Sequence, residues 1–121
     1  MRVIALEEHF TVPSLVARID KGAIAAQGFR PRAVPATGPS PMDLAPEIGP
    51  DRLAYMDEAG ITMQVLSSTG PGPDLAPGPE GVAIAREMND YLAQAVANNP
   101  GRFAGFAVLP MLSPEACAAE L

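Results

Sequence analysis

The hydrophobic positions of this chain form three short apolar runs, separated by amphipathic segments and by segments rich in Pro and Gly. The first run lies within residues 2–10, begins Val-Ile-Ala-Leu after Arg2, and turns polar at Glu7. The other two are "ITMQVLS" at 61–67 and "RFAGFAVL" at 102–109. Short runs rich in β-branched and apolar residues are typical of strands buried on both faces. The pattern therefore predicts three buried strands.

Helical patterns lie between these runs. Residues 51–59 follow a proline and end before Gly60, which we expect to stop the helix in a left-handed conformation. Residues 80–98 form the clearest predicted helix and end before a proline. Ser113 and Pro114 predict a third helix start, with the serine as its cap. The helical spacing in 80–98 is set by Val82, Ala85, Met88 or Asn89, Leu92 and Val96.

The order of elements, strand, loop, helix, strand, helix, strand, helix, predicts an α/β fold. Alternating strands and helices imply parallel pairing, right-handed crossovers and functional groups at the carboxyl ends of the strands. The 121 residues suffice for one domain and should not be split. Three strands are fewer than a closed (β/α)₈ barrel needs, which typically takes about 250 residues.

Residues 11–50 form a long loop after the first strand. Its Pro and Gly residues, as in "FRPRAVPATGPSP", forbid a continuous helix or a central strand, although "PSLVARIDKGAIAA" could form a brief helix after Pro13. Arg30 and Arg32 in this loop either meet a carboxylate substrate or form a solvated basic pair. A second loop, "STGPGPDLAPGP", is predicted to contain neither helix nor strand.

Charge and composition narrow the classes of partner. The net charge of −6 comes from scattered acids, which argues against a nucleic-acid or anionic-membrane partner. No apolar run approaches the roughly 20 residues of a membrane span, and the start of the chain lacks the pattern of a secretory signal. The single cysteine, Cys117, excludes an intramolecular disulfide. We therefore expect a soluble cytoplasmic protein with a small-molecule ligand.

The first predicted strand ends in an unusual polar group, Glu7-Glu8-His9. Strand alternation puts Glu7 and His9 on one face with Ala5, and Glu8 on the other face with Leu6. A carboxylate beside an imidazole at the carboxyl end of a parallel strand suits Zn²⁺ or a similar cation. The alternative is a polar strand terminus that meets water.

The second predicted strand ends at the same mouth in Ser67-Ser68-Thr69-Gly70. A hydroxyl there, Ser68, is a candidate for contact with substrate, and the alternative is a role in forming the turn. The following Gly-Pro-Gly-Pro lacks the pattern of a phosphate-binding loop, so nucleotide binding has no support.

The segments "ALEEHF", "DRLAYMDEAGITMQVLSS" and "GPEGVAIAREMNDYLAQAVANNPGRFAGFAVLPMLSPEAC" together carry a family resemblance. The chain resembles the amino-terminal part of the amidohydrolase-2 branch of the amidohydrolase superfamily. It is most similar to the non-oxidative decarboxylases of hydroxybenzoates, such as the gamma-resorcylate and 2,3-dihydroxybenzoate decarboxylases. Residues 3–10 and 49–121 carry the resemblance, and the loop between them matches poorly. The resemblance implies the amino-terminal part of a distorted (β/α)₈ TIM barrel.

The resemblance also implies roles for two residues. Glu7 and His9 match the first-strand ligands of a single divalent metal, usually zinc, with manganese or magnesium in some members. Other members carry His-x-His there, and the glutamate version favours the decarboxylases. Their further ligands, a histidine near the fifth strand and an aspartate after the eighth, would lie beyond Leu121. This chain would then supply two ligands and about a third of a barrel, as a fragment, with its remainder on another chain, or as a truncated relic.

Three functions stay open at this point. The first is an enzyme fragment for decarboxylation of a small hydroxylated aromatic carboxylic acid. The second keeps the barrel and the metal but hydrolyses a lactone or an amide with metal-bound water. The third is a non-catalytic partial barrel whose exposed strand edges drive self-association. Full barrels of this family are commonly dimers or tetramers, so we expect a homo-oligomer, and we predict that the isolated 121-residue chain is inactive.

Overall fold

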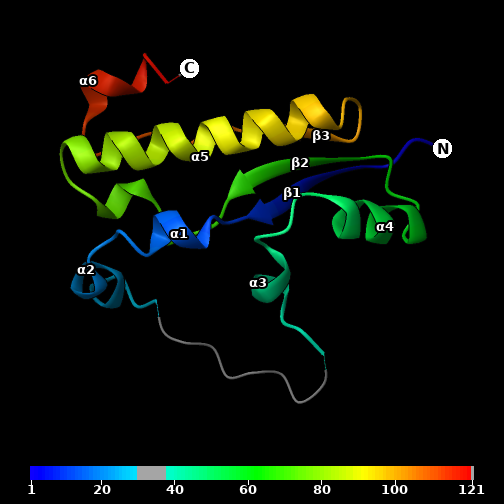
Figure 1. The fold of residues 1–121 in the computed structure, drawn as a ribbon, viewed down its shortest axis with the longest axis horizontal. Coiled ribbons are helices and arrows are strands. Elements are labelled where there is room, and N and C mark those ends of the chain that lie inside the picture. The colour runs from blue at the N-terminus through cyan, green and yellow to red at the C-terminus, as the bar shows by residue number, and fades with distance from the viewer. Residues whose placement is uncertain (30–37, 121) are drawn as a thin grey trace.

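A three-stranded parallel sheet organises the chain (Figure 1). The computed structural model describes residues 1–29 and 38–120. Strand β1 spans Ile4–Phe10, β2 spans Met63–Ser68 and β3 spans Phe103–Gly105, in the spatial order β1-β2-β3. The parallel α/β pattern predicted from the sequence is therefore confirmed. The arrowheads of β1 and β2 point to the end of the sheet where α1 begins, which makes that end the mouth.

The helices fill the connections between the strands. They are α1 (Pro13–Val16), α2 (Lys21–Ala26), α3 (Pro41–Leu44), α4 (Pro50–Glu58), α5 (Pro79–Asn98) and α6 (Pro114–Cys117), with a 3₁₀ helix, η1 (Pro73–Leu75). The predicted helices 51–59 and 80–98 are confirmed to within one residue at each end. Gly60 follows α4 with φ +70°, which confirms it as the left-handed stop.

Three expectations about loops and the ends of elements differ from the structure. The second loop contains η1, because Pro73 presets the backbone angle of a tight first turn. The third strand ends at Gly105 rather than at 109, because the side chain of Asn89, and not a strand, binds the backbone of Val108. Ser113 precedes α6 as predicted, but its side chain makes no capping hydrogen bond.

The core lies between the sheet and the helices. Phe10, Leu66 and Phe103, one from each strand, are at most 2% exposed and pack with Met56 of α4 and Leu92 of α5. Burial of each such side chain contributes about 1.5–3 kcal/mol. The buried face of α5 is rotated slightly from the predicted one: Val82 and Val96 are only partly buried, and Ile84 and Ala95 are buried instead. Its buried apolar residues are Ile84, Ala85, Met88, Leu92 and Ala95.

The opposite face of the sheet carries exposed apolar side chains. Ile4 is 43% exposed and Phe106, just after β3, is 59% exposed. Ile4 pairs with Met63, whose side chain lies on the opposite side of the sheet from the buried Gln64 next to it. Phe106 likewise lies on the opposite side from Gly105, which packs against Leu92 of α5. Both side chains therefore lie on the face that no helix covers among the described residues. In a closed barrel, this face would line the interior.

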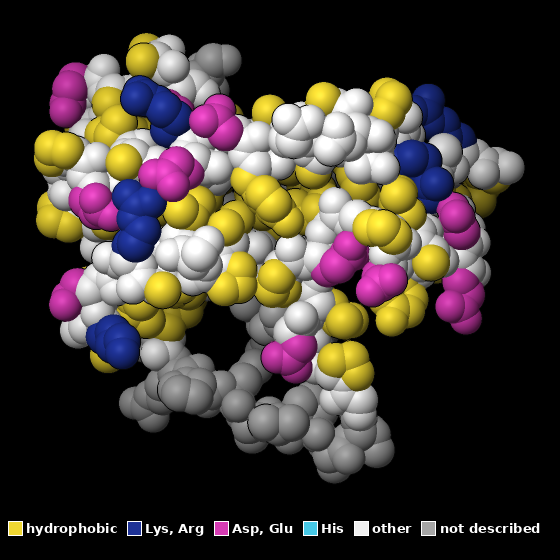
Figure 2. Space-filling model, in the orientation of Figure 1, with side chains coloured by type: hydrophobic (Ala, Val, Ile, Leu, Met, Phe, Trp, Pro, Cys, Tyr) yellow, Lys and Arg dark blue, Asp and Glu magenta, His cyan; other side chains and the backbone are white. Residues whose placement is uncertain are grey.

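Surface charge in the described part of the chain is mixed. Figure 2 shows acidic and basic side chains scattered over the face in view, without a continuous field of one sign. Arg18, after α1, binds Glu80 and Glu87 of α5 at 2.7 Å each and ties the start of the long loop to that helix. Over these described residues, none of the helices combines the length and the apolar character that a membrane crossing requires.

Candidate metal centre

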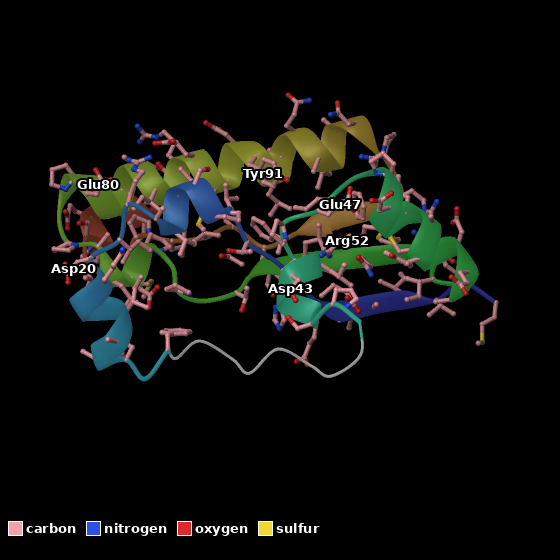
Figure 3. The ribbon with its side chains drawn as sticks, turned by 60° about the horizontal axis from the view of Figure 1, so that its bottom comes forward. Asp20, Asp43, Glu47, Arg52, Glu80 and Tyr91 are labelled. Carbon is pink, nitrogen blue, oxygen red and sulfur yellow. The ribbon has the colours of Figure 1, made fainter. Side chains whose placement is uncertain are left out.

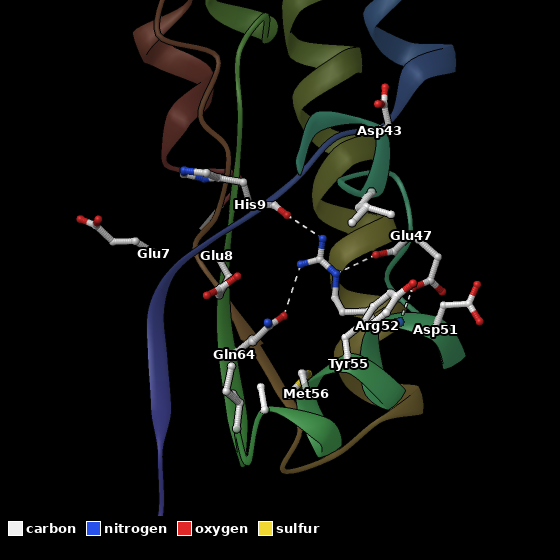
Figure 4. A pocket seen from close by; sticks show the side chains of 13 residues that line it. Glu7, Glu8, His9, Asp43, Glu47, Asp51, Arg52, Tyr55, Met56 and Gln64 are labelled. Carbon is white, nitrogen blue, oxygen red and sulfur yellow. Dashed lines mark hydrogen bonds between the residues drawn. The ribbon is translucent and has the colours of Figure 1, made fainter. Parts of the chain in front are cut away.

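The predicted polar group lies at the carboxyl end of β1. Figure 4 shows Glu7 and His9 on one side of the strand and Glu8 on the other, toward Arg52 and Gln64. The alternation predicted for these three residues is therefore found. Glu7 and His9 are exposed, as side chains at an open mouth would be, whereas Glu8 is half-buried.

A β-bulge sets this arrangement and corrects one expectation. Ala5 pairs with Gln64 and Glu8 pairs with Leu66, so two residues of β1 stand opposite one residue of β2. Since Gln64 and Leu66 share the helix-facing side, Ala5 lies on the side of Glu8 and not, as predicted, with Glu7 and His9. A bulge re-aims side chains and is frequent beside active sites. Here it separates the apolar start of β1 from its polar end.

Among residues 1–29 and 38–120, the imidazole of His9 forms a hydrogen bond with one side chain, that of Ser67. Nδ1 lies 3.1 Å from Oγ of Ser67, its register partner in β2. The ring nitrogen left for a ligand is therefore Nε2. The sequence pattern had suggested Ser68, and not Ser67, as the hydroxyl at the mouth. Strand alternation from the buried Leu66 could have indicated Ser67, because the next residue must face the opposite side.

Arg52 of α4 holds the main chain around the site. Its Nη2 donates to the carbonyl oxygen of His9 at 2.8 Å, its Nε to that of Glu47 at 2.8 Å and its Nη1 to Oε1 of Gln64 at 3.3 Å. The Glu47 carboxylate accepts from the backbone N–H of Arg52 at 2.7 Å. Burial lowers the pKa of Arg52, while the nearby Glu8 carboxylate acts in the opposite direction. Figure 3 shows Arg52 and Glu47 together between α4 and the sheet.

A cavity of about 700 Å³ borders this network. It runs from the end of β1 to α3 and α4, and Figure 4 shows its lining side chains. The cavity carries more acidic than basic groups. Its ionisable lining residues are Glu7, Glu8, His9, Asp43, Glu47, Asp51, Arg52 and Tyr55.

The donor set fits a divalent cation in type but is incomplete. A carboxylate and an imidazole are ligands that Zn²⁺ and Mn²⁺ accept, and the His9–Ser67 contact leaves Nε2 available. Within residues 1–29 and 38–120, no group of three or more His, Cys, Asp or Glu side chains is placed to hold a metal ion. Glu7 and His9 could therefore be two ligands of a site that needs others.

The remaining candidates are placed as follows. Ser68 pairs with Phe10, and its Oγ lies 3.9 Å from Sδ of the buried Met88 in α5. Its hydroxyl thus faces the helix side, and its contact with substrate stays a prediction. Arg30 and Arg32 lie outside the described residues.

Comparisons with known proteins identify the family of the chain. The amidohydrolase family model matches residues 8–121. Gamma-resorcylate decarboxylase of Rhodococcus jostii is 38% identical over 120 residues, which cover 98% of this chain and 33% of that enzyme. This chain therefore spans about a third of the length of such relatives.

Solved structures of decarboxylases are also similar to this chain. The dihydroxybenzoic acid decarboxylase of Polaromonas, with bound manganese and the inhibitor 2-nitroresorcinol, is 33% identical with a TM-score of 0.72; the match covers 99% of this chain and 34% of that one. The 5-carboxyvanillate decarboxylase of Novosphingobium aromaticivorans, complexed with manganese and 4-hydroxy-3-methoxy-5-nitrobenzoic acid, is 30% identical with a TM-score of 0.77; the match covers 98% and 37%. With its parallel strands and polar strand end, the chain belongs to the amidohydrolase family and forms the amino-terminal part of that family's TIM-barrel fold.

Proposed function

We propose that the protein to which this chain belongs is a metal-dependent decarboxylase of a small hydroxylated aromatic carboxylic acid. The observation that carries the proposal is the placement of Glu7 and His9 on one side of β1 at the mouth of the sheet. The similarity to decarboxylases of such acids supports the substrate class.

Glu7 and His9 would hold a divalent cation through a carboxylate oxygen and the free imidazole nitrogen. Zinc is our first choice, and manganese, which is bound in similar structures, or magnesium would also suit these ligands. When bound, such a cation stabilises negative charge on the carboxylate and phenolic oxygens of a substrate. Glu7 and His9 would hold the cation, Ser67 contacts the imidazole of His9, and Arg52 binds the main-chain carbonyl of His9.

Further ligands and the acid that protonates the ring carbon would come from outside these 121 residues. We also propose a cytoplasmic homo-oligomer. The exposed apolar face that includes Ile4 and Phe106 supports burial against additional protein, from the same chain or from another.

The test uses a longer protein, if the reading frame continues past Leu121. Its metal content is measured after purification, and its turnover of 2,6-dihydroxybenzoate is followed by carbon dioxide release. Glu7→Gln and His9→Ala should each lose metal and turnover. Glu8→Gln is the matched control, because Glu8 lies on the other side of β1, and it should keep its metal. Full metal content in Glu7→Gln would contradict the assignment.

The same assay separates the competing functions. Hydrolysis of a lactone or an amide without carbon dioxide release would assign the hydrolase activity instead. If a stop codon follows Leu121, the partial barrel is favoured by the exposed Ile4 and Phe106. The chain should then sediment as an oligomer, and a monomer at all concentrations would contradict that function.

A further inference from the structure

Within the described part of the chain, the side chain of His9 forms a hydrogen bond with Ser67, and this contact determines which ring nitrogen can bind a ligand. Nδ1 is 3.1 Å from Oγ of Ser67, and the two residues are register partners in adjacent parallel strands. A neutral imidazole has one protonated and one unprotonated nitrogen. The contact is possible with either, because a hydroxyl can accept or donate. Only the tautomer with the proton on Nδ1 leaves a lone pair on Nε2 for a ligand.

We propose that Ser67 is a positioning residue that holds His9 in the Nδ1–H tautomer, with the lone pair of Nε2 directed to the barrel interior. The inference rests on the proposed function in one respect, the role of His9 as a metal ligand. Metal-binding histidines generally donate their second ring N–H to a fixed acceptor, which sets the tautomer and the ring orientation. Ser67 Oγ is the acceptor that the structure provides.

The main chain supports the same geometry. Arg52 Nη2 donates to the carbonyl oxygen of His9 at 2.8 Å, and the same guanidinium reaches Gln64 of β2. The backbone of His9 is thus tied to β2 through Arg52, while its side chain is tied to β2 through Ser67. The contact with Ser67 favours the ring orientation in which Nδ1 faces β2 and Nε2 faces the mouth.

Ser68 provides a matched control in the next position. Its hydroxyl also lies in β2, but it faces α5, where Oγ is 3.9 Å from Sδ of Met88. Ser67 and Ser68 therefore differ in the face that they occupy and not in chemistry. An effect specific to Ser67 cannot arise from loss of a hydroxyl at the end of β2 in general.

The experiment measures the tautomer of His9 directly in the 121-residue chain without metal. Because the sequence contains one histidine, long-range ¹H–¹⁵N correlation spectra show one imidazole. The spectra are recorded at about pH 8.5, and the ¹⁵N chemical shifts of the ring report directly which nitrogen carries the proton. The wild-type chain and Ser67→Thr should show mainly Nδ1–H. Ser67→Ala should shift toward Nε2–H, the form that imidazole prefers in water, and Ser68→Ala should match the wild type.

In these spectra, two results would overturn the proposal: a wild-type imidazole that is mainly Nε2–H, or equal tautomer populations in Ser67→Ala and the wild type. The rescue by Ser67→Thr guards against a loss of folding, since threonine keeps the hydroxyl. Backbone amide spectra of each variant check that the sheet is intact.

A titration with Zn²⁺ alone connects the tautomer to the metal site. Zn²⁺ should shift the Nε2 resonance of the wild type, and Ser67→Ala should bind about 10- to 100-fold more weakly. Binding through Nδ1 would overturn the proposal. If Zn²⁺ shifts neither nitrogen while the tautomer is as expected, the Ser67 contact is supported, and His9 is contradicted as a metal ligand within this chain. The two failures are therefore distinguishable.

Discussion

Asn89 of α5 makes a pair of hydrogen bonds with the backbone of a single residue, Val108. Its Nδ2 donates to the carbonyl oxygen of Val108 at 2.9 Å, and the N–H of Val108 donates to Oδ1 of Asn89 at 2.7 Å. This is the pattern by which one strand binds another, but here a side chain supplies it. The segment after β3 is thereby attached to α5 at the mouth of the sheet.

We predict that Asn89→Ala destabilises the chain by about 1–3 kcal/mol, because it leaves the N–H and C=O of Val108 without their partners. Urea unfolding followed by circular dichroism measures the change. Asn98→Ala is the matched control: Asn98 is an exposed residue of the same helix that accepts a hydrogen bond from Gln94, and its loss should cost no more than about 0.5 kcal/mol. Equal effects at the two positions would contradict the prediction.

Arg52→Lys tests whether the forked geometry of Arg52 is needed. Lysine is charged too, but its ammonium cannot serve the carbonyls of His9 and Glu47 and the side chain of Gln64 in the same fixed arrangement. We expect a loss of about 2 kcal/mol in unfolding free energy. The control is Arg86→Lys, whose 60% exposed side chain pairs with the largely buried carboxylate of Glu120. Lysine keeps the charge of this ion pair, so we expect a loss of about 0.5 kcal/mol or less. Similar losses in both variants would show that charge alone suffices.

Strands and helices could be predicted from the sequence, whereas the contacts of Arg52 could not. The strand at 61–67 and the helix at 80–98 were predictable, because periodicity and local stop signals determine them. The positions of Glu7 and His9 at a strand end were predictable for the same reason. Arg52 was not, since its partners His9, Glu47 and Gln64 are brought together only by the fold.

The bulge in β1 shows a second limit. Strand alternation predicted one phase from residue 3 to residue 10, and the structure changes phase between Ala5 and Glu8. Alternation is a property of a regular strand, and no local residue signal marks the insertion of one extra residue against a neighbouring strand. The predicted alternation of sides holds among Glu7, Glu8 and His9, because regular alternation resumes at the end of the bulge.

Gly81→Ala sets helix propensity against packing. Alanine favours a helix over glycine by about 1 kcal/mol, but a Cβ at Gly81 would lie 2.0 Å from the carbonyl oxygen of Ala76, a backbone atom that cannot turn away. We expect the clash to dominate and the variant to be less stable than wild type by about 1–3 kcal/mol. Differential scanning calorimetry gives the result. Ala93→Gly, on the exposed face of α5, calibrates propensity alone at about 1 kcal/mol. A stabilised Gly81→Ala would contradict the prediction.

The capping box of α3 should make a pH-dependent contribution. The N–H of Ser40 donates to Oδ2 of Asp43 at 2.8 Å, and this bond, with that from the Ser40 hydroxyl, lowers the pKa of Asp43. A carboxyl with a lowered folded pKa stabilises the fold above its unfolded pKa of about 3.9, and that stability is lost as pH falls through the folded value. The unfolding free energy of wild type minus Asp43→Ala should therefore be constant above about pH 5 and shrink below about pH 4. A difference that grows on acidification would contradict this assignment.

The isolated chain should not decarboxylate a hydroxybenzoate. A catalytic metal typically has three protein ligands, and residues 1–29 and 38–120 bring no three metal-binding side chains together. Glu7 and His9 alone should bind Zn²⁺ or Mn²⁺ weakly. Purified chain with 2,6-dihydroxybenzoate and either ion, assayed for resorcinol by chromatography, should match a reaction that contains the ion without protein. Turnover above that background which disappears in His9→Ala would contradict the prediction, because it would show that Glu7 and His9 suffice without the rest of the barrel.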